Sequence, residues 1–315
     1  MKKNSFIEGT IIATICIVIV KILGMFYVIP FYAIVGSTGA ALYAYAYNLY
    51  GLFLEIATAG IPNAVSKIIN EYNTLNKQEA KIRTFQIGKR LLSLIAVFAF
   101  IIMFVFAPQL SELIIGDLTG GNTIEDVTFV IRCVSFALLV FPFLSVTRGF
   151  FQGHNIISVS SVSQVIEQLA RVLVIIIGSY IALKWLHLDL TTAVGVAVFG
   201  AFVGGLCALL YVRGKLKQNK KALALDEKFE VRDEVTNKEI IKKIIKYAIP
   251  IVIVSIAFTI YNNVDMILVL RTMNYLGLDA DEVEFIATGI STWAPKISIV
   301  ITSIVLGLSA SLIPN

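Results

Sequence analysis

Long apolar runs recur along this chain and constrain its fold more than any other feature. Residues 9–35, for example, contain a single charged side chain, that of Lys21. Such a run is long enough to cross the ~30 Å hydrocarbon core of a bilayer as a helix, and too long for a barrel strand of about ten residues. Because backbone groups inside a bilayer must be satisfied within the segment, the sequence predicts an all-α integral membrane protein.

The composition agrees with this assignment. Hydrophobic residues make up 57% of the chain and charged residues 15%, with a mean hydropathy of +0.85, which lies outside the range of soluble domains. About eight transmembrane helices are expected, at residues 8–35, 40–62, 91–107, 128–150, 158–183, 190–212, 244–270 and 287–313. They divide the chain into a six-helix N-lobe (1–212), a cytoplasmic basic linker (213–243) and the first two helices of an incomplete C-lobe (244–315).

The distribution of charge predicts the orientation. Lys and Arg collect in residues 67–90 and 213–246, whereas the loops at 112–126 and 279–284 are acidic. By the positive-inside rule, the N-terminus and both basic loops are cytoplasmic in a multi-pass protein of the cell membrane. This topology accounts for the net charge of +5, so no nucleic-acid partner is expected.

Motifs for catalysis or metal binding are missing from the sequence. The three cysteines lie singly in apolar runs and the two histidines lie near span ends, so neither a disulfide framework nor a metal site is predicted. HExxH, GxSxG and phosphate-binding glycine loops are also absent. We therefore expect no cofactor and no enzymatic activity.

The second expected span carries polar groups at bilayer depth. Glu55 lies in the middle of an otherwise apolar run, and Tyr43, Tyr47 and Tyr50 recur at helical spacing to form one aromatic face. A charged side chain at this depth costs roughly 2.5 to 3.5 kcal/mol, so it normally faces the protein interior or a hydrated cavity. Glu55, Tyr43 and Tyr47 are therefore candidate cavity residues.

Basic side chains occur inside several other spans. Lys21 and Lys296 lie ten or more residues inside their spans, too deep for easy snorkelling, which favours a hydrated cavity. Glu167 and Arg171 are spaced to pair on one helix face, which is compatible with a cavity site or with a structural ion pair. Two further candidates, which could equally be an interfacial anchor, are Arg148 and Gln152. Four cations facing one cavity would suit a phosphate-bearing substrate.

A coupling ion has one candidate position in the seventh span. Asn262 and Asp265 place oxygen groups within one helical turn, where they could help to hold Na⁺ or a proton. The alternative interpretation is a buried polar network between helices.

Two features of the second half of the chain predict how it packs. The small residues from Gly200 to Gly205 favour close approach of two helices. Residues 304–315, IVLGLSASLIPN, resemble residues 52–63, LFLEIATAGIPN, which indicates an internal repeat of the kind found in transporters. Spans seven and eight would then begin a second lobe whose remaining helices are absent, and we expect them to be attached to the first six with few contacts.

Several motifs together resemble the polysaccharide-transporter branch of the MATE-like flippase superfamily, in particular lipid II flippases and stage V sporulation protein B. The motifs are YAYAYNLY at 43–50, ATAGIP at 57–62, RGFFQG at 148–153 and EQLAR at 167–171. The resemblance implies a two-lobed helical bundle that moves a lipid-linked oligosaccharide by alternating access through a central cationic cavity. It also implies substrate contacts for Lys21 and Lys296 and a cation-site role for Asp265. Family members have twelve to fourteen spans, so this chain would be a fragment.

The sequence therefore favours a flippase for a lipid-linked glycan precursor of peptidoglycan, spore or capsule polysaccharide. One alternative is a cation-coupled multidrug exporter of the same fold, whose cavity should be dominated by carboxylates instead. Another is a non-transporting scaffold that recruits cell-wall synthases through its basic loops.

Overall fold

The structure is a computed structural model that describes residues 6–58, 60–116, 118, 120–220, 223, 225 and 234–296. Within these residues every regular element is helical, which confirms the all-α prediction. The first half contains α1 (Phe6–Phe26), α2 (Val28–Thr58), α3 (Gly60–Thr74), α4 (Gln78–Val105), α5 (Ala107–Ile115), α6 (Ile124–Ser135) and the 3₁₀ turn η1 (Phe136–Leu139). The second half contains α7 (Phe141–Gly153), α8 (Ile157–Leu173), the π-helical turns η2 (Val174–Gly178) and η3 (Ile181–Trp185), α9 (Leu190–Gln218), α10 (Asn237–Tyr275), α11 (Ala280–Thr288) and the π-helical η4 (Gly289–Trp293).

Six stretches of the described chain are long and apolar enough to cross a membrane. They are Ile11–Thr74, Gln78–Val105, Ile124–Gly153, Ile157–Trp185, Leu190–Gln218 and Asn237–Tyr275. The first stretch contains both the first and second expected spans, and the chain reverses between them at Gly36, where φ is +70° and a side chain would be strained. The eighth expected span is described only as far as Lys296.

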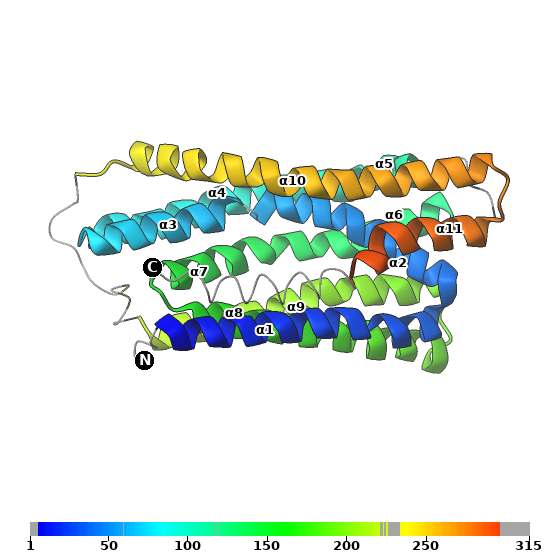
Figure 1. Cartoon of the computed structure of the whole chain (residues 1–315), viewed down its shortest axis with the longest axis horizontal. Helices are drawn as coiled ribbons and strands as arrows, with labels where there is room; N and C mark the ends of the chain where they lie inside the picture. The colour runs from blue at the N-terminus through cyan, green and yellow to red at the C-terminus, as the bar shows by residue number, and fades with distance from the viewer. Residues whose placement is uncertain are drawn as a thin grey trace.

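The helices lie side by side in one elongated bundle (Figure 1). α1 packs along α8, and α8 packs along α9. On the other side of the bundle, α3 contacts α4 and α7, and α10 runs beside α2, α3 and α4. The bundle therefore places α1, α2, α7 and α8 around a common interior.

Small residues bring α8 and α9 into backbone contact, as the Gly200–Gly205 segment predicts. A Cβ atom on Gly204 would lie 2.5 Å from the backbone oxygen of Glu167, and one on Gly200 would lie 3.1 Å from that of Arg171. The glycines therefore allow α9 to pack against the part of α8 that carries Glu167 and Arg171. At the N-terminus of α9, the carboxylate of Asp189 accepts hydrogen bonds from the backbone and hydroxyl of Thr192, which hold the pKa of Asp189 below its usual range.

The expectation of few contacts with the first six spans is wrong for the seventh span. An added Cβ at Gly60 in α3 would lie 2.5 Å from the backbone oxygen of Ala248, so α10 approaches α3 closely. Further along α10, Asn263 donates a hydrogen bond to the backbone oxygen of Asn48, and Arg271 donates one to that of Leu113. α10 thus contacts the other helices along most of its length, because it carries an apolar face that must be buried.

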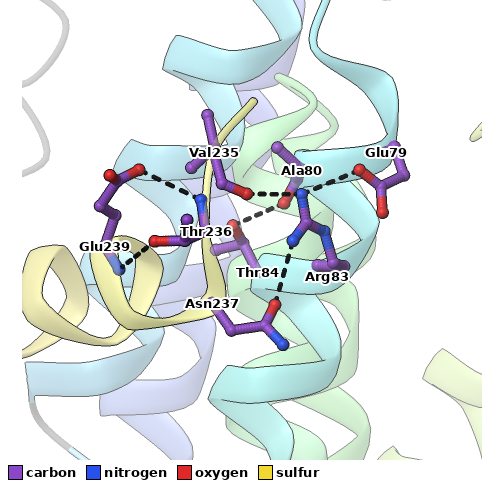
Figure 2. Close-up of polar contacts among 8 residues, drawn as sticks. All are labelled: Glu79, Ala80, Arg83, Thr84, Val235, Thr236, Asn237 and Glu239. Atoms are coloured by element: carbon purple, nitrogen blue, oxygen red, sulfur yellow. Dashed lines mark hydrogen bonds and ion pairs between the residues drawn. The ribbon is translucent and has the colours of Figure 1, made fainter. Parts of the chain in front are cut away.

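The start of α10 is also fixed on α4 (Figure 2). Thr236 and Glu239 form a capping box, in which each side chain accepts a hydrogen bond from the backbone N–H of the other residue. Arg83 of α4 donates to the backbone oxygen of Val235 at 2.7 Å and to the side chain of Asn237 at 3.1 Å. The expected linker is therefore partly helical, since α9 extends to Gln218 and α10 begins at Asn237. Residues 304–315, the second copy of the expected repeat, lie outside the described residues.

We predict that Gly204→Ala destabilises the bundle, because the added methyl group must displace the α8 backbone at Glu167. Overpacking of this kind costs about 1–3 kcal/mol. The control is Gly214→Ala in the same helix, where nothing lies within 4 Å of the added Cβ and alanine stabilises a helix by up to about 1 kcal/mol. Thermal unfolding in detergent compares the two variants. Equal melting temperatures would contradict the close approach of α8 and α9.

Candidate functional site

A cavity of about 610 Å³ lies between α1, α2, α7, α8 and the segment that ends at Lys296. Its described lining includes the four basic side chains of Lys21, Arg148, Arg171 and Lys296 and the single carboxylate of Glu167. These five residues come from four separate parts of the chain, spread over more than 270 positions by sequence number. The fold therefore brings together charges that the sequence shows only as isolated residues in separate apolar spans.

The arginines are held by a carboxylate that bridges α7 and α8. One oxygen of Glu167 lies 2.9 Å from Arg148 of α7, and the other lies 2.5 Å from Arg171, one turn further along α8. Arg148 also donates to the Ser163 hydroxyl at 2.7 Å, and Arg171 donates to the Tyr47 hydroxyl at 2.8 Å. All three charged side chains are only 12% exposed, so removing any one would leave a poorly hydrated charge.

This arrangement contains features of both interpretations of the Glu167–Arg171 pair, the structural ion pair and the cavity site. The Glu167–Arg171 pair forms as its spacing predicts, and it is structural in the sense that both side chains are paired. Both residues nevertheless line the cavity, as does Arg148, which lies inside the bundle. A single carboxylate neutralises at most one of the two guanidinium groups, so the network as a whole stays positive.

The two lysines of the cavity have no carboxylate partner among the residues that the structure describes. Lys296 donates to the Tyr27 hydroxyl at 2.6 Å, and its ammonium group lies 4.5 Å from the centre of the Tyr27 ring and 4.1 Å from that of Trp293. Lys21 lines the cavity from α1 and forms no hydrogen bond or ion pair with another described residue. Within the described residues, neither ammonium group is therefore neutralised by an acid.

Aromatic rings close the space beyond Lys296. Tyr43 is 1% exposed and stacks on Tyr47 with ring centres 5.2 Å apart, and it also contacts Phe31 at 5.0 Å and Trp293 at 6.1 Å. Tyr32 meets the Trp293 ring edge-on at 5.4 Å. Tyr43 thus lies behind the cavity wall, where it positions Tyr47.

Other predicted residues lie elsewhere. Glu55 and Gln152 are half-buried and are not among the residues that line the cavity. Asn262 and Asp265 are also half-buried and lie on α10, away from the charged network. In the described ranges, no group of three or more His, Cys, Asp or Glu side chains could hold a metal ion.

The neighbouring Asn263 forms part of a buried polar network between helices. Its amide contacts the backbone oxygen of Asn48 at 3.3 Å, while the Asn48 amide donates to the Thr292 hydroxyl at 2.7 Å. The alternative interpretation of this polar segment, a network between helices, therefore holds for Asn263. This network joins α2, α10 and η4 and includes Thr292, the residue before Trp293.

Sequence reasoning missed part of the polar lining. Gln164 and Gln168 on α8, and Tyr27 before α2, also face the cavity. The glutamines follow the same helical spacing as Glu167 and Arg171, so a polar stripe at intervals of three and four residues could have identified them. Tyr27 gives no such indication, because its contact with Lys296 joins residues far apart in sequence.

We predict that Glu167→Gln destabilises the protein by on the order of 3 kcal/mol, because it leaves two buried guanidinium groups without their shared carboxylate. Glu112→Gln is the matched control, since Glu112 is exposed and a surface change of this kind stays within about 0.5 kcal/mol. Denaturant unfolding in detergent measures both. A Glu167→Gln variant as stable as the control would show that the network is dispensable for folding.

Comparison with known sequences finds relatives along the whole chain. The profile of the polysaccharide biosynthesis protein family matches residues 6–315. The lipid II flippase MurJ of Bacillus subtilis (strain 168) is 35% identical over 315 residues, covering 99% of this chain and 58% of the flippase. Stage V sporulation protein B of the same organism is 23% identical over 212 residues, covering 67% of this chain and 39% of that protein. The chain thus spans less than two thirds of the length of these relatives.

Solved structures share the fold at low sequence identity. The MATE multidrug transporter DinF-BH superposes with a TM-score of 0.72 at 13% identity, covering 99% of this chain and 65% of that chain. A MOP superfamily transporter from Pyrococcus furiosus, described as having a binding pocket of reverse polarity, superposes at 0.61 and 14% identity, covering 96% of this chain and 69% of that chain. These relatives are transporters and flippases, not enzymes.

Proposed function

Because the chain belongs to the polysaccharide biosynthesis protein family, we propose that it moves a lipid-linked oligosaccharide precursor across the cytoplasmic membrane. The observation that carries this proposal is the charge of the cavity, where four basic side chains meet one carboxylate. The 35% identity to a lipid II flippase supports a substrate of the same class. Peptidoglycan, spore and capsule precursors all belong to that class.

The lining suits a pyrophosphate group. Ammonium and guanidinium groups form charge-assisted hydrogen bonds to phosphate oxygens, which are roughly twice as strong as neutral ones. Lys21 and Lys296 supply ammonium donors that have no carboxylate partner among the described residues. Arg148 and Arg171 are held in fixed orientations by Glu167, so they present planar donors at defined positions. The lipid chain of the substrate would remain in the bilayer while the charged group occupies the cavity.

The proposal includes an orientation and alternating access. With the N-terminus and the loops at 67–90 and 213–246 in the cytoplasm, α11 and the α5–α6 loop lie at the opposite side of the membrane. Coupling to Na⁺ or H⁺ through Asn262 and Asp265 belongs to the same proposal, with oxygen groups from other residues completing the site. Binding of cell-wall synthases at the basic loops is a further expectation.

The sign of the cavity separates this proposal from a multidrug exporter. An exporter of organic cations needs carboxylates that attract positive charge, whereas the cavity here would repel it. The similarity to the DinF-BH transporter shows the fold alone. A scaffold without transport activity would have no use for half-buried lysines that lack a carboxylate partner in the described part of the chain, because such charges are costly in a membrane.

We predict that Lys21→Ala weakens binding of a polyprenyl pyrophosphate to the purified chain by at least about tenfold, because one charge-assisted contact contributes about 1.5–3 kcal/mol. Lys21→Arg should retain part of the affinity, since it keeps the charge but changes the geometry. Lys89→Ala is the control, because Lys89 is exposed on α4 outside the cavity. Native mass spectrometry measures the affinities. Unchanged binding by Lys21→Ala would assign Lys21 to packing or lipid contact.

A further inference from the structure

A buried carboxylate, that of Glu284, lies outside the cavity on α11. Glu284 on α11 is 0% exposed, and its carboxylate accepts hydrogen bonds from Asn122 in the loop between α5 and α6. The Asn122 backbone N–H donates to one oxygen at 3.0 Å. The Asn122 amide contacts the two oxygens at 2.9 and 2.8 Å.

The loop is shaped to approach this carboxylate. A Cβ atom on Gly121 would lie 2.9 Å from Oε1 of Glu284, so a side chain at that position would collide with it. Gly120 has φ of +97°, a conformation that residues with side chains rarely adopt. The two glycines therefore let the backbone close over α11, and an added Cβ on Gly120 would lie 3.6 Å from the Cβ of Ala280.

The same asparagine reaches the reversal between the first two spans. Its amide lies 3.0 Å from the backbone oxygen of Thr38, two residues after Gly36. The Thr38 hydroxyl in turn donates to Asp281 of α11 at 3.0 Å, at an exposed position. Asn122 thus joins α2, the α5–α6 loop and α11.

We infer that Glu284 is a positioning residue, whose contact with Asn122 holds this side of the carrier closed and has to break when the cavity opens there. The inference rests on the proposed function for its role in transport. Lys296 follows Glu284 by twelve residues, about 18 Å along a helix, so movement of α11 is passed on to the cavity. The ring contact of Trp293 with Tyr43 and the hydrogen bond of Asn48 with Thr292 lie between Glu284 and Lys296.

The chemistry of a buried carboxylate makes the contact two-state. A fully buried charge is tolerated only while donors replace its water, and here Asn122 provides the donors. Once α11 and the loop separate, the carboxylate must be hydrated instead, so partly separated arrangements are unfavourable. Such an element suits a gate, because it favours either closed contact or full opening.

The test measures how well the closed contact shields Ala280, which is 7% exposed beneath the loop. The purified chain carrying Ala280→Cys is treated with a hydrophilic maleimide, and labelling at position 280 is followed by peptide mass spectrometry, which separates it from the three native cysteines. Glu284→Gln leaves an amide facing the Asn122 amide, and Asn122→Asp brings two carboxylates together. Each should raise the labelling rate about tenfold, the effect of losing one charge-assisted hydrogen bond.

The double variant Glu284→Gln with Asn122→Asp exchanges the carboxylate and the amide and should restore part of the protection, although the bond from position 122 to the Thr38 carbonyl stays lost. A general loss of packing would not be reversed in this way. Glu282→Gln, an exposed neighbour on α11, is the control and should leave the rate unchanged. Single variants that label like the parent, or a double variant no better protected than the singles, would overturn the inference. Because labelling needs no substrate, this outcome is independent of whether the cavity binds a lipid pyrophosphate.

Discussion

A charge in the interior of a membrane bundle must be paired or hydrated, and the carboxylate of Glu167 satisfies that requirement for two arginines at once. It joins α7 to α8 at the cavity wall, while glycines of α9 hold the α8 backbone at the same level. Removing the acid would leave two guanidinium groups repelling each other across a poorly hydrated space. The arrangement of the cavity wall therefore depends on one side chain.

The two lysines add to the positive charge that this network leaves. Lys296 is held by the rings of Tyr27 and Trp293, which stabilise an ammonium group without neutralising it. Lys21 has neither an aromatic ring nor a carboxylate as a partner in the described part of the chain. A shared fold with multidrug transporters says nothing about the substrate, since the fold allows cavities of either sign. The sign of the cavity carries that information.

Much of this could be predicted from the sequence, and the limits have a common cause. Apolar run lengths located the spans, Gly36 lies at the expected reversal, and helical spacing predicted the pairing of Glu167 with Arg171. These features depend on one segment at a time. The contacts of Glu167 with Arg148, of Lys296 with Tyr27 and of Glu284 with Asn122 depend on how separate helices are rotated and stacked, which periodicity does not specify. The close packing of α10 was missed for the same reason.

The central claim is that the cavity selects for negative charge, and a ligand series on the purified chain tests it most directly. A polyprenyl pyrophosphate, the corresponding monophosphate, the uncharged alcohol and a lipophilic organic cation share an apolar part and differ in charge. The account predicts that affinity falls in that order, with the pyrophosphate bound at least about tenfold more tightly than the alcohol, and with the cation bound least. Equal or tighter binding of the cation would contradict the account and favour a multidrug exporter.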